Sequence, residues 1–239
     1  MYKQLGIFLT TVLLYFYFVR LDPTNNDYPK EELKTVIFKI LPILSLIYMV
    51  FSTRQFRKVK KLPFDYQNLI LMGLIFSLMG DICLVWRIKL FIPGICLFAI
   101  GHLFYIGAQG WKPKGYIIGL VLSLGLFIMG SFVISYMKAP AEQVATSGYM
   151  VLIFVHFWRA AIRTVYFPSG AANLVLLGIT VFVISDYLIV FDQFVWKVEN
   201  ASLYIMITYY LSQLCIACSA YGDNSHTHGK TRSHTRKVR

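Results

Sequence analysis

The chain has 239 residues, of which 57% are hydrophobic and only 14% are charged. Because soluble domains carry about 25% charged residues, this composition excludes a soluble globular protein and indicates a polytopic helical membrane protein. The formal net charge is +12, and no polar segment is long enough for a second domain, so we expect one compact all-α membrane domain.

Apolar runs and the breakers between them predict eight membrane-spanning helices, since a helix needs about 20 apolar residues to cross a bilayer. We expect these helices at 4–19, 36–51, 67–86, 90–109, 115–137, 147–166, 171–191 and 202–221. The first run lacks a small-residue cleavage site, so we interpret it as an uncleaved helix rather than a signal peptide.

Basic residues are distributed unevenly between the two sides of this arrangement. With a cytoplasmic N-terminus, the inside segments include 52–66 and the tail from 222, and the whole net charge of +12 falls on that side. The positive-inside rule therefore favours eight helices with both termini cytoplasmic over a seven-helix arrangement. We expect a transmembrane domain at 1–221 and a basic cytoplasmic tail at 222–239, which suits anionic lipid rather than nucleic acid.

Charged side chains inside the predicted helices are candidates for function, because each costs about 2.5–3.5 kcal/mol to insert near the centre of a bilayer. They are Lys39, Asp81, Arg159 and Asp186. Asp81 and Asp186 both lie near the outward end of a helix, and Lys39 lies near the start of a helix that begins on the same side. We therefore expect these three to share one membrane layer, which would form the floor of a cavity open to the non-cytoplasmic side.

Uncharged polar residues on two further helices extend this candidate site. We expect the following side chains to line or support the cavity and to bind substrate together with Lys39: His102, Tyr105, Tyr209, Tyr210 and Gln213. A purely structural ion-pair network among Lys39, Asp81 and Asp186 is the alternative. Two other polar residues have ordinary interpretations, since His156 suits a buried core position and Arg159 suits snorkelling toward the interface.

Signatures of metal and serine hydrolases are missing from the sequence. The predicted spans contain no H-x-x-x-H ligand pair, and no G-x-S-x-G stretch is present. Cys215 and Cys218 form a C-x-x-C without a second pair, on a membrane helix, where cysteines are typically small buried hydrophobes. We therefore expect no metal and no cofactor.

Several stretches carry a resemblance to a known family: "GDICLVW" at 80–86, "FAIGHLFYIGA" at 98–108, "ISDYLIVFDQF" at 184–194, "YYLSQL" at 209–214, and Lys39 followed by Pro42. In these the chain resembles the lysoplasmalogenase-type integral membrane family, the YhhN-like or TMEM86-like proteins. The resemblance implies hydrolysis of the vinyl ether bond of lysoplasmalogens to a fatty aldehyde and glycerophospho-ethanolamine or -choline. It also implies that Asp81 and Asp186 are the family's paired aspartates, and that the protein resides in the endoplasmic reticulum or another cellular membrane.

The chemistry of this reaction suits two carboxyl groups. Protonation of the β-carbon of a vinyl ether gives an oxocarbenium ion, to which water adds, and the hemiacetal then collapses to aldehyde and alcohol. One protonated acid and one ionised carboxylate are needed, as in glycosidases, which act on a similar cation. Two alternatives remain open: another lysophospholipid hydrolase on the same scaffold, and a transporter or lipid-binding protein with a buried proton relay.

Overall fold

The computed structural model describes residues 2–20, 29–56 and 65–222, and within them each of the eight predicted helices is an α-helix. Their bounds are α1 Tyr2–Tyr15, α2 Leu33–Phe56, α3 Tyr66–Cys83, α4 Arg87–Gln109, α5 Tyr116–Ile134, α6 Pro140–Tyr166, α7 Gly170–Val190 and α8 Ala201–Gly222. Three short turns adjoin them: π-helical η1 Phe16–Arg20, 3-10 helical η2 Leu84–Trp86 and π-helical η3 Phe191–Val195. The all-helical class is thus confirmed, while the predicted tail at 222–239 lies outside the described residues except for Gly222, which ends α8.

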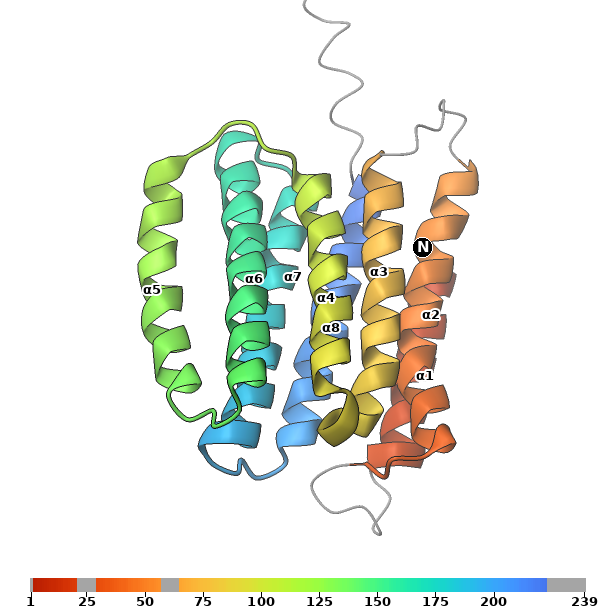
Figure 1. The fold of residues 1–239 in the computed structure, drawn as a ribbon. Helices are drawn as coiled ribbons and strands as arrows, with labels where there is room; N and C mark the ends of the chain where they lie inside the picture. The colour runs from red at the N-terminus through yellow and green to blue at the C-terminus, as the bar shows by residue number, and fades with distance from the viewer. Residues whose placement is uncertain (1, 21–28, 57–64, 223–239) are drawn as a thin grey trace, which may run out of the picture.

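The helices stand side by side as an up-and-down bundle (Figure 1). α3 packs extensively against α4, and α7 against α8, while α8 also packs against α2 and α3. α5 lies at the edge of the bundle, where its main neighbour is α6. The carboxyl ends of α3 and α7 and the amino end of α2 all lie at one end of the bundle, which is the lower end in Figure 1.

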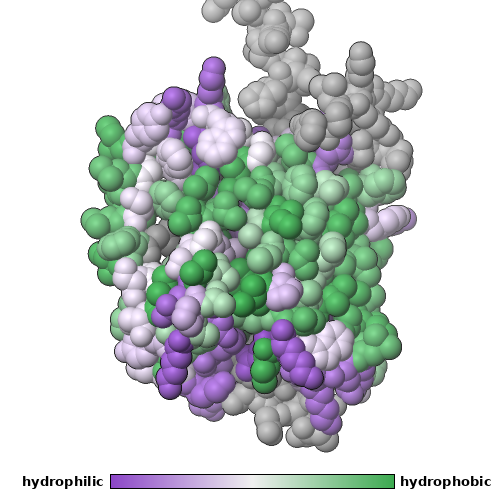
Figure 2. Space-filling view, viewed as in Figure 1, coloured by the Kyte–Doolittle hydropathy of each residue, from purple (hydrophilic) through white to green (hydrophobic). Residues whose placement is uncertain are grey.

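The surface of the bundle is suited to a membrane. Figure 2 shows hydrophobic side chains across the middle of the molecule and hydrophilic ones gathered toward its ends. By length and hydropathy, seven helical segments of the described chain can span a bilayer. One of them, Tyr66–Gln109, comprises α3, η2 and α4, which lie alongside each other. The protein is therefore a multi-pass membrane protein, whereas eight crossings and cytoplasmic termini stay predictions.

Glycines let α3 and α4 approach closely, as small residues do in membrane helix pairs. A Cβ atom on Gly101 would lie 3.1 Å from the carbonyl oxygen of Gly73, and one on Gly80 would lie 2.7 Å from the ring of Phe98. A Cβ atom on Gly73 would overlap the ring of Tyr105. The α3–α4 contact thus fixes the ring of Tyr105, whose hydroxyl group belongs to the polar interior of the bundle.

Replacing Gly73 by alanine is expected to destabilise the fold by about 1–3 kcal/mol, because overpacking a close helix contact forces side chains or backbone to shift. Thermal unfolding of the detergent-purified protein measures this change. Gly148→Ala is the matched control, since no other atom lies within 4 Å of a Cβ atom at this position in α6. Equal unfolding temperatures for the two variants would show that the α3–α4 approach is looser than described.

Candidate active site

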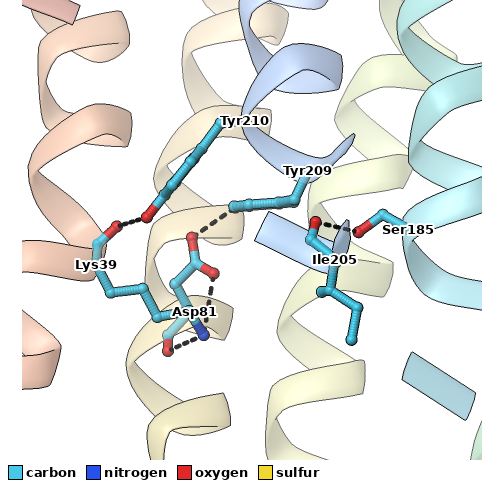
Figure 3. Close-up of polar contacts among 6 residues, drawn as sticks. All are labelled: Lys39, Asp81, Ser185, Ile205, Tyr209 and Tyr210. Atoms are coloured by element: carbon cyan, nitrogen blue, oxygen red, sulfur yellow. Dashed lines mark hydrogen bonds and ion pairs between the residues drawn. The ribbon is translucent and has the colours of Figure 1, made fainter. Parts of the chain in front are cut away.

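Asp81 lies near the carboxyl end of α3 and is only 2% exposed. The hydroxyl group of Tyr209 on α8 donates a hydrogen bond of 2.5 Å to its Oδ2 atom. The Nζ atom of Lys39 on α2 lies 3.5 Å from its Oδ1 atom and donates a 3.2 Å hydrogen bond to its backbone carbonyl oxygen. Three helices therefore converge on this carboxyl group, which is both ion-paired and hydrogen-bonded (Figure 3).

A second tyrosine fixes the position of Lys39. The hydroxyl group of Tyr210, next to Tyr209 on α8, donates a 2.9 Å hydrogen bond to the backbone carbonyl oxygen of Lys39 (Figure 3). The two adjacent tyrosines thus reach different helices, one binding the carboxylate and the other the helix that carries its cation. Lys39 and Asp81 thus form an ion pair, and their roles in substrate binding and catalysis stay predictions.

Asp186, near the carboxyl end of α7, has a separate environment. Its Oδ2 atom accepts a 2.7 Å hydrogen bond from the hydroxyl group of Tyr149 on α6. The preceding residue, Ser185, donates a 3.0 Å hydrogen bond to the carbonyl oxygen of Ile205 on α8. Because neighbouring residues of an α-helix point about 100° apart, Ser185 anchors α7 to α8 while Asp186 is turned toward α6.

An apolar cavity lies beside Asp186. Side chains of η2, α4, α5, α6 and α7 line it, and nearly all of them are aliphatic or aromatic. Its polar lining comes from Asp186, from Tyr149 and Tyr187, and from Thr146, whose hydroxyl group is buried with no hydrogen-bond partner among the described residues. Such a concave apolar space with few polar groups is typical of a small-molecule site.

The remaining predicted residues form a polar interior between α4, α6 and α8. The Nδ1 atoms of His102 and His156 lie 3.0 Å apart, and the hydroxyl group of Tyr105 donates a 2.9 Å hydrogen bond to Oε1 of Gln213. All four side chains are at most 1% exposed, so none of them faces lipid. They are therefore part of the interior of the bundle, and a role of His102, Tyr105 and Gln213 in binding substrate stays a prediction.

The two carboxyl groups are connected through aromatic packing. Phe98 lines the apolar cavity beside Asp186, and its ring centroid lies 6.0 Å from that of Tyr209, the residue that binds Asp81. Asp186 belongs to the described lining of this cavity, and Asp81 does not. A separation of about 10 Å or less between the two carboxyl groups, as paired-carboxylate hydrolysis requires, stays a prediction.

Arg159 corrects one sequence-based expectation. Its side chain does not snorkel; it is 1% exposed and donates hydrogen bonds of 2.7 and 2.8 Å to the carbonyl oxygens of Gly110 and Pro113. Both acceptors lie between α4 and α5, where backbone carbonyls have no helical partner. The guanidinium group therefore fixes the α4–α5 connection.

Sequence reasoning missed Tyr149 and Thr146, the two α6 residues on the wall beside Asp186. A signal was present, because Thr146, Tyr149, Ile153 and His156 recur at the three- and four-residue spacing of one helix face. Polar groups on such a face of a membrane helix indicate that it turns toward the protein interior. Within the described residues, no three His, Cys, Asp or Glu side chains are placed to hold a metal ion.

Comparison with known proteins agrees with the family resemblance found in the sequence. The model of the YhhN family matches residues 34–220. The chain is 29% identical to human "Lysoplasmalogenase TMEM86B", over 80% of this chain and 78% of that protein. It is 31% identical to bovine "Lysoplasmalogenase TMEM86A", over 63% and 64% of the two chains, and 28% identical to mouse "Lysoplasmalogenase TMEM86B", over 78% and 75%. No solved structure matches the chain.

Proposed function

Because the chain belongs to the YhhN family, we propose that it is a membrane hydrolase that cleaves the vinyl ether bond of lysoplasmalogens. Its products would be a fatty aldehyde and a glycerophospho-ethanolamine or -choline. The observation that carries this proposal is a half-buried carboxyl group, Asp186, on the wall of an apolar cavity. A lysoplasmalogen presents its reactive double bond at the head of an apolar chain, so the bond and an acid would meet in such a cavity.

The environments of the two carboxyl groups support different roles. Asp81 is ion-paired with Lys39, so it suits the ionised carboxylate that stabilises a cation and accepts a proton from water. Asp186 lies on the wall of the apolar cavity, where Tyr149 positions its carboxyl group, so it suits the acid that protonates the β-carbon. Water then adds to the oxocarbenium carbon, and the hemiacetal breaks its bond to the glycerol oxygen, which takes up a proton.

The proposal is tested by measuring aldehyde release from a 1-alkenyl lysophospholipid by the purified protein in lipid nanodiscs. The matched 1-acyl and 1-alkyl lysophospholipids are the controls. Aldehyde from the alkenyl substrate alone supports vinyl ether cleavage. Fatty acid release from the acyl substrate would instead indicate another lysophospholipid hydrolase, and no turnover of any substrate would contradict the enzyme assignment.

We also propose that the protein crosses the membrane eight times, with both termini and the loop 52–66 on the cytoplasmic side of the endoplasmic reticulum. The concentration of Lys and Arg on one side supports this orientation. Seven crossings would place the two termini on opposite sides, whereas eight place them on the same side.

Epitope tags at the two ends, tested for antibody access in selectively permeabilised cells, distinguish the two topologies. We expect both tags to be accessible when only the plasma membrane is permeabilised. If one tag is accessible at that stage and the other becomes accessible only after the internal membranes are also opened, the eight-crossing topology is ruled out. The same images, compared with an endoplasmic reticulum marker, test the location.

A further inference from the structure

A second cavity adjoins the apolar cavity at the same end of the bundle. It lies between α2, η2, α4, η3 and α8. Its lining is much more polar and includes Lys39, Arg87, Glu31 and Gln193. We name it the polar cavity.

The two cavities share three lining side chains, Leu84, Phe91 and Ile189. Two of these come from a stretch of irregular backbone, since Leu84 begins the 3-10 turn η2 and Phe91 follows Leu90, whose φ and ψ of −117° and 23° are not helical. This irregularity lets one chain segment contribute to both cavities. The partition between the cavities is therefore only a few apolar side chains thick.

The polar cavity offers partners for a zwitterionic headgroup. Lys39 and Arg87 supply cationic donors of the kind that bind phosphate oxygens, and Glu31 supplies a carboxylate. The Oε1 atom of Gln193 is buried and has no hydrogen-bond partner among the described residues. A buried acceptor of this kind favours a ligand that donates a hydrogen bond, as a glycerol hydroxyl or an ammonium group does.

We propose that one lysophospholipid molecule occupies both cavities, with its phosphodiester headgroup in the polar cavity and its alkenyl chain in the apolar cavity. This inference rests on the proposed function, because it takes the vinyl ether as the link between the two ends. The ether bond then crosses the partition formed by Leu84, Phe91 and Ile189, on the side where Asp186 lines the wall. Headgroup and chain selectivity are consequently determined by different residues.

The headgroup end is tested with Arg87→Gln, using two substrates: 1-alkenyl-glycerophosphoethanolamine, and 1-alkenylglycerol, which lacks the phosphodiester. Loss of a charged donor is expected to raise KM for the phosphodiester substrate about tenfold and to leave KM for 1-alkenylglycerol unchanged. Lys89→Gln is the matched control, because Lys89 lies on the same helix, is exposed and does not line the polar cavity. Lys89→Gln changes the net charge by the same amount as Arg87→Gln.

The chain end is tested with Ile153→Phe, which adds volume on the wall of the apolar cavity one helical turn beyond Tyr149. We expect kcat/KM for a long-chain alkenyl substrate to fall about tenfold relative to a short-chain one, because the lost space excludes methylene groups. Val151→Phe is the control, since Val151 is exposed on the same helix and does not line this cavity.

Binding of a non-cleavable 1-alkyl lysophosphatidylethanolamine, measured by displacement of a fluorescent lysolipid in nanodiscs, makes the test independent of turnover. We expect Arg87→Gln to weaken binding about tenfold and Lys89→Gln to leave it unchanged. If the wild type binds this lipid but releases no aldehyde, the proposed function fails and the two-cavity site stands. If Arg87→Gln and Ile153→Phe change all substrates equally, or act as their controls do, the two-cavity site is wrong.

Discussion

Replacing Asp186 by asparagine, or Asp81 by asparagine, is expected to lower the rate of aldehyde release at least about 100-fold, the usual scale of general acid–base catalysis. Asparagine keeps the size and polarity of the side chain but cannot give or take the proton. The double variant should lose little more than the worse single variant, because residues that act as a unit have non-additive effects. The measurement is aldehyde released per mole of monodisperse purified protein.

Folding should survive both substitutions, so the activity loss can be assigned to chemistry. In Asp81→Asn, the ammonium group of Lys39 keeps its hydrogen bond to the backbone carbonyl oxygen of residue 81 and its place on the wall of the polar cavity. In Asp186→Asn, the amide oxygen can still accept the hydrogen bond from Tyr149. Near-normal turnover in both single variants would end the paired-carboxyl mechanism.

Replacing Lys39 by methionine is expected to destabilise the protein by about 3–5 kcal/mol, the cost of leaving one member of a buried ion pair without its partner. Methionine approximates the length of the lysine chain, so the change removes the charge with little loss of volume. The carboxylate of Asp81 would remain buried with its hydrogen bond from Tyr209 but without a counter-charge. The unfolding temperature and the yield of monodisperse protein measure the effect.

The double variant Lys39→Met/Asp81→Asn separates stability from catalysis. It contains neither charge, so most of the lost stability should return, while aldehyde release should stay as low as in Asp81→Asn. A double variant as unstable as Lys39→Met would show that Lys39 stabilises the fold through contacts other than the ion pair. Recovery of activity along with stability would make the pair purely structural, which was the alternative left open by the sequence.

The two carboxyl groups have distinct environments, which support the different roles proposed for them. Asp81 is held by two other helices, α2 through Lys39 and α8 through Tyr209. Asp186 faces a cavity that suits the apolar part of a lipid and is held by Tyr149. General acid–base catalysis of vinyl ether cleavage needs one carboxyl group as proton donor and one as a stabilised anion. Two carboxyl groups in different environments suit this reaction better than two in equivalent environments.

The sequence by itself determined the membrane class, the eight helices and the polar groups of interest. Long apolar runs in a bilayer form α-helices, because a helix satisfies every backbone N–H and C=O group within the same segment. The sequence also identified Asp81, Asp186 and Lys39 as candidates for function, because a charge in an apolar run is costly wherever the helix packs. Short links join α3 to α4 and α7 to α8, and such links make each pair antiparallel neighbours in contact.

Only the tertiary structure decided which groups meet. Helical periodicity gives the face on which a side chain lies but not the neighbour that this face contacts, and rotations of the helices settle whether Asp186 turns toward Tyr149 or toward Asp81. In the structure Asp81 contacts Lys39 and Tyr209, and Asp186 contacts Tyr149, while the distance between the two carboxyl groups stays a prediction. The partition at Leu84 and Phe91 depends on non-helical backbone around η2, which no apolar pattern specifies.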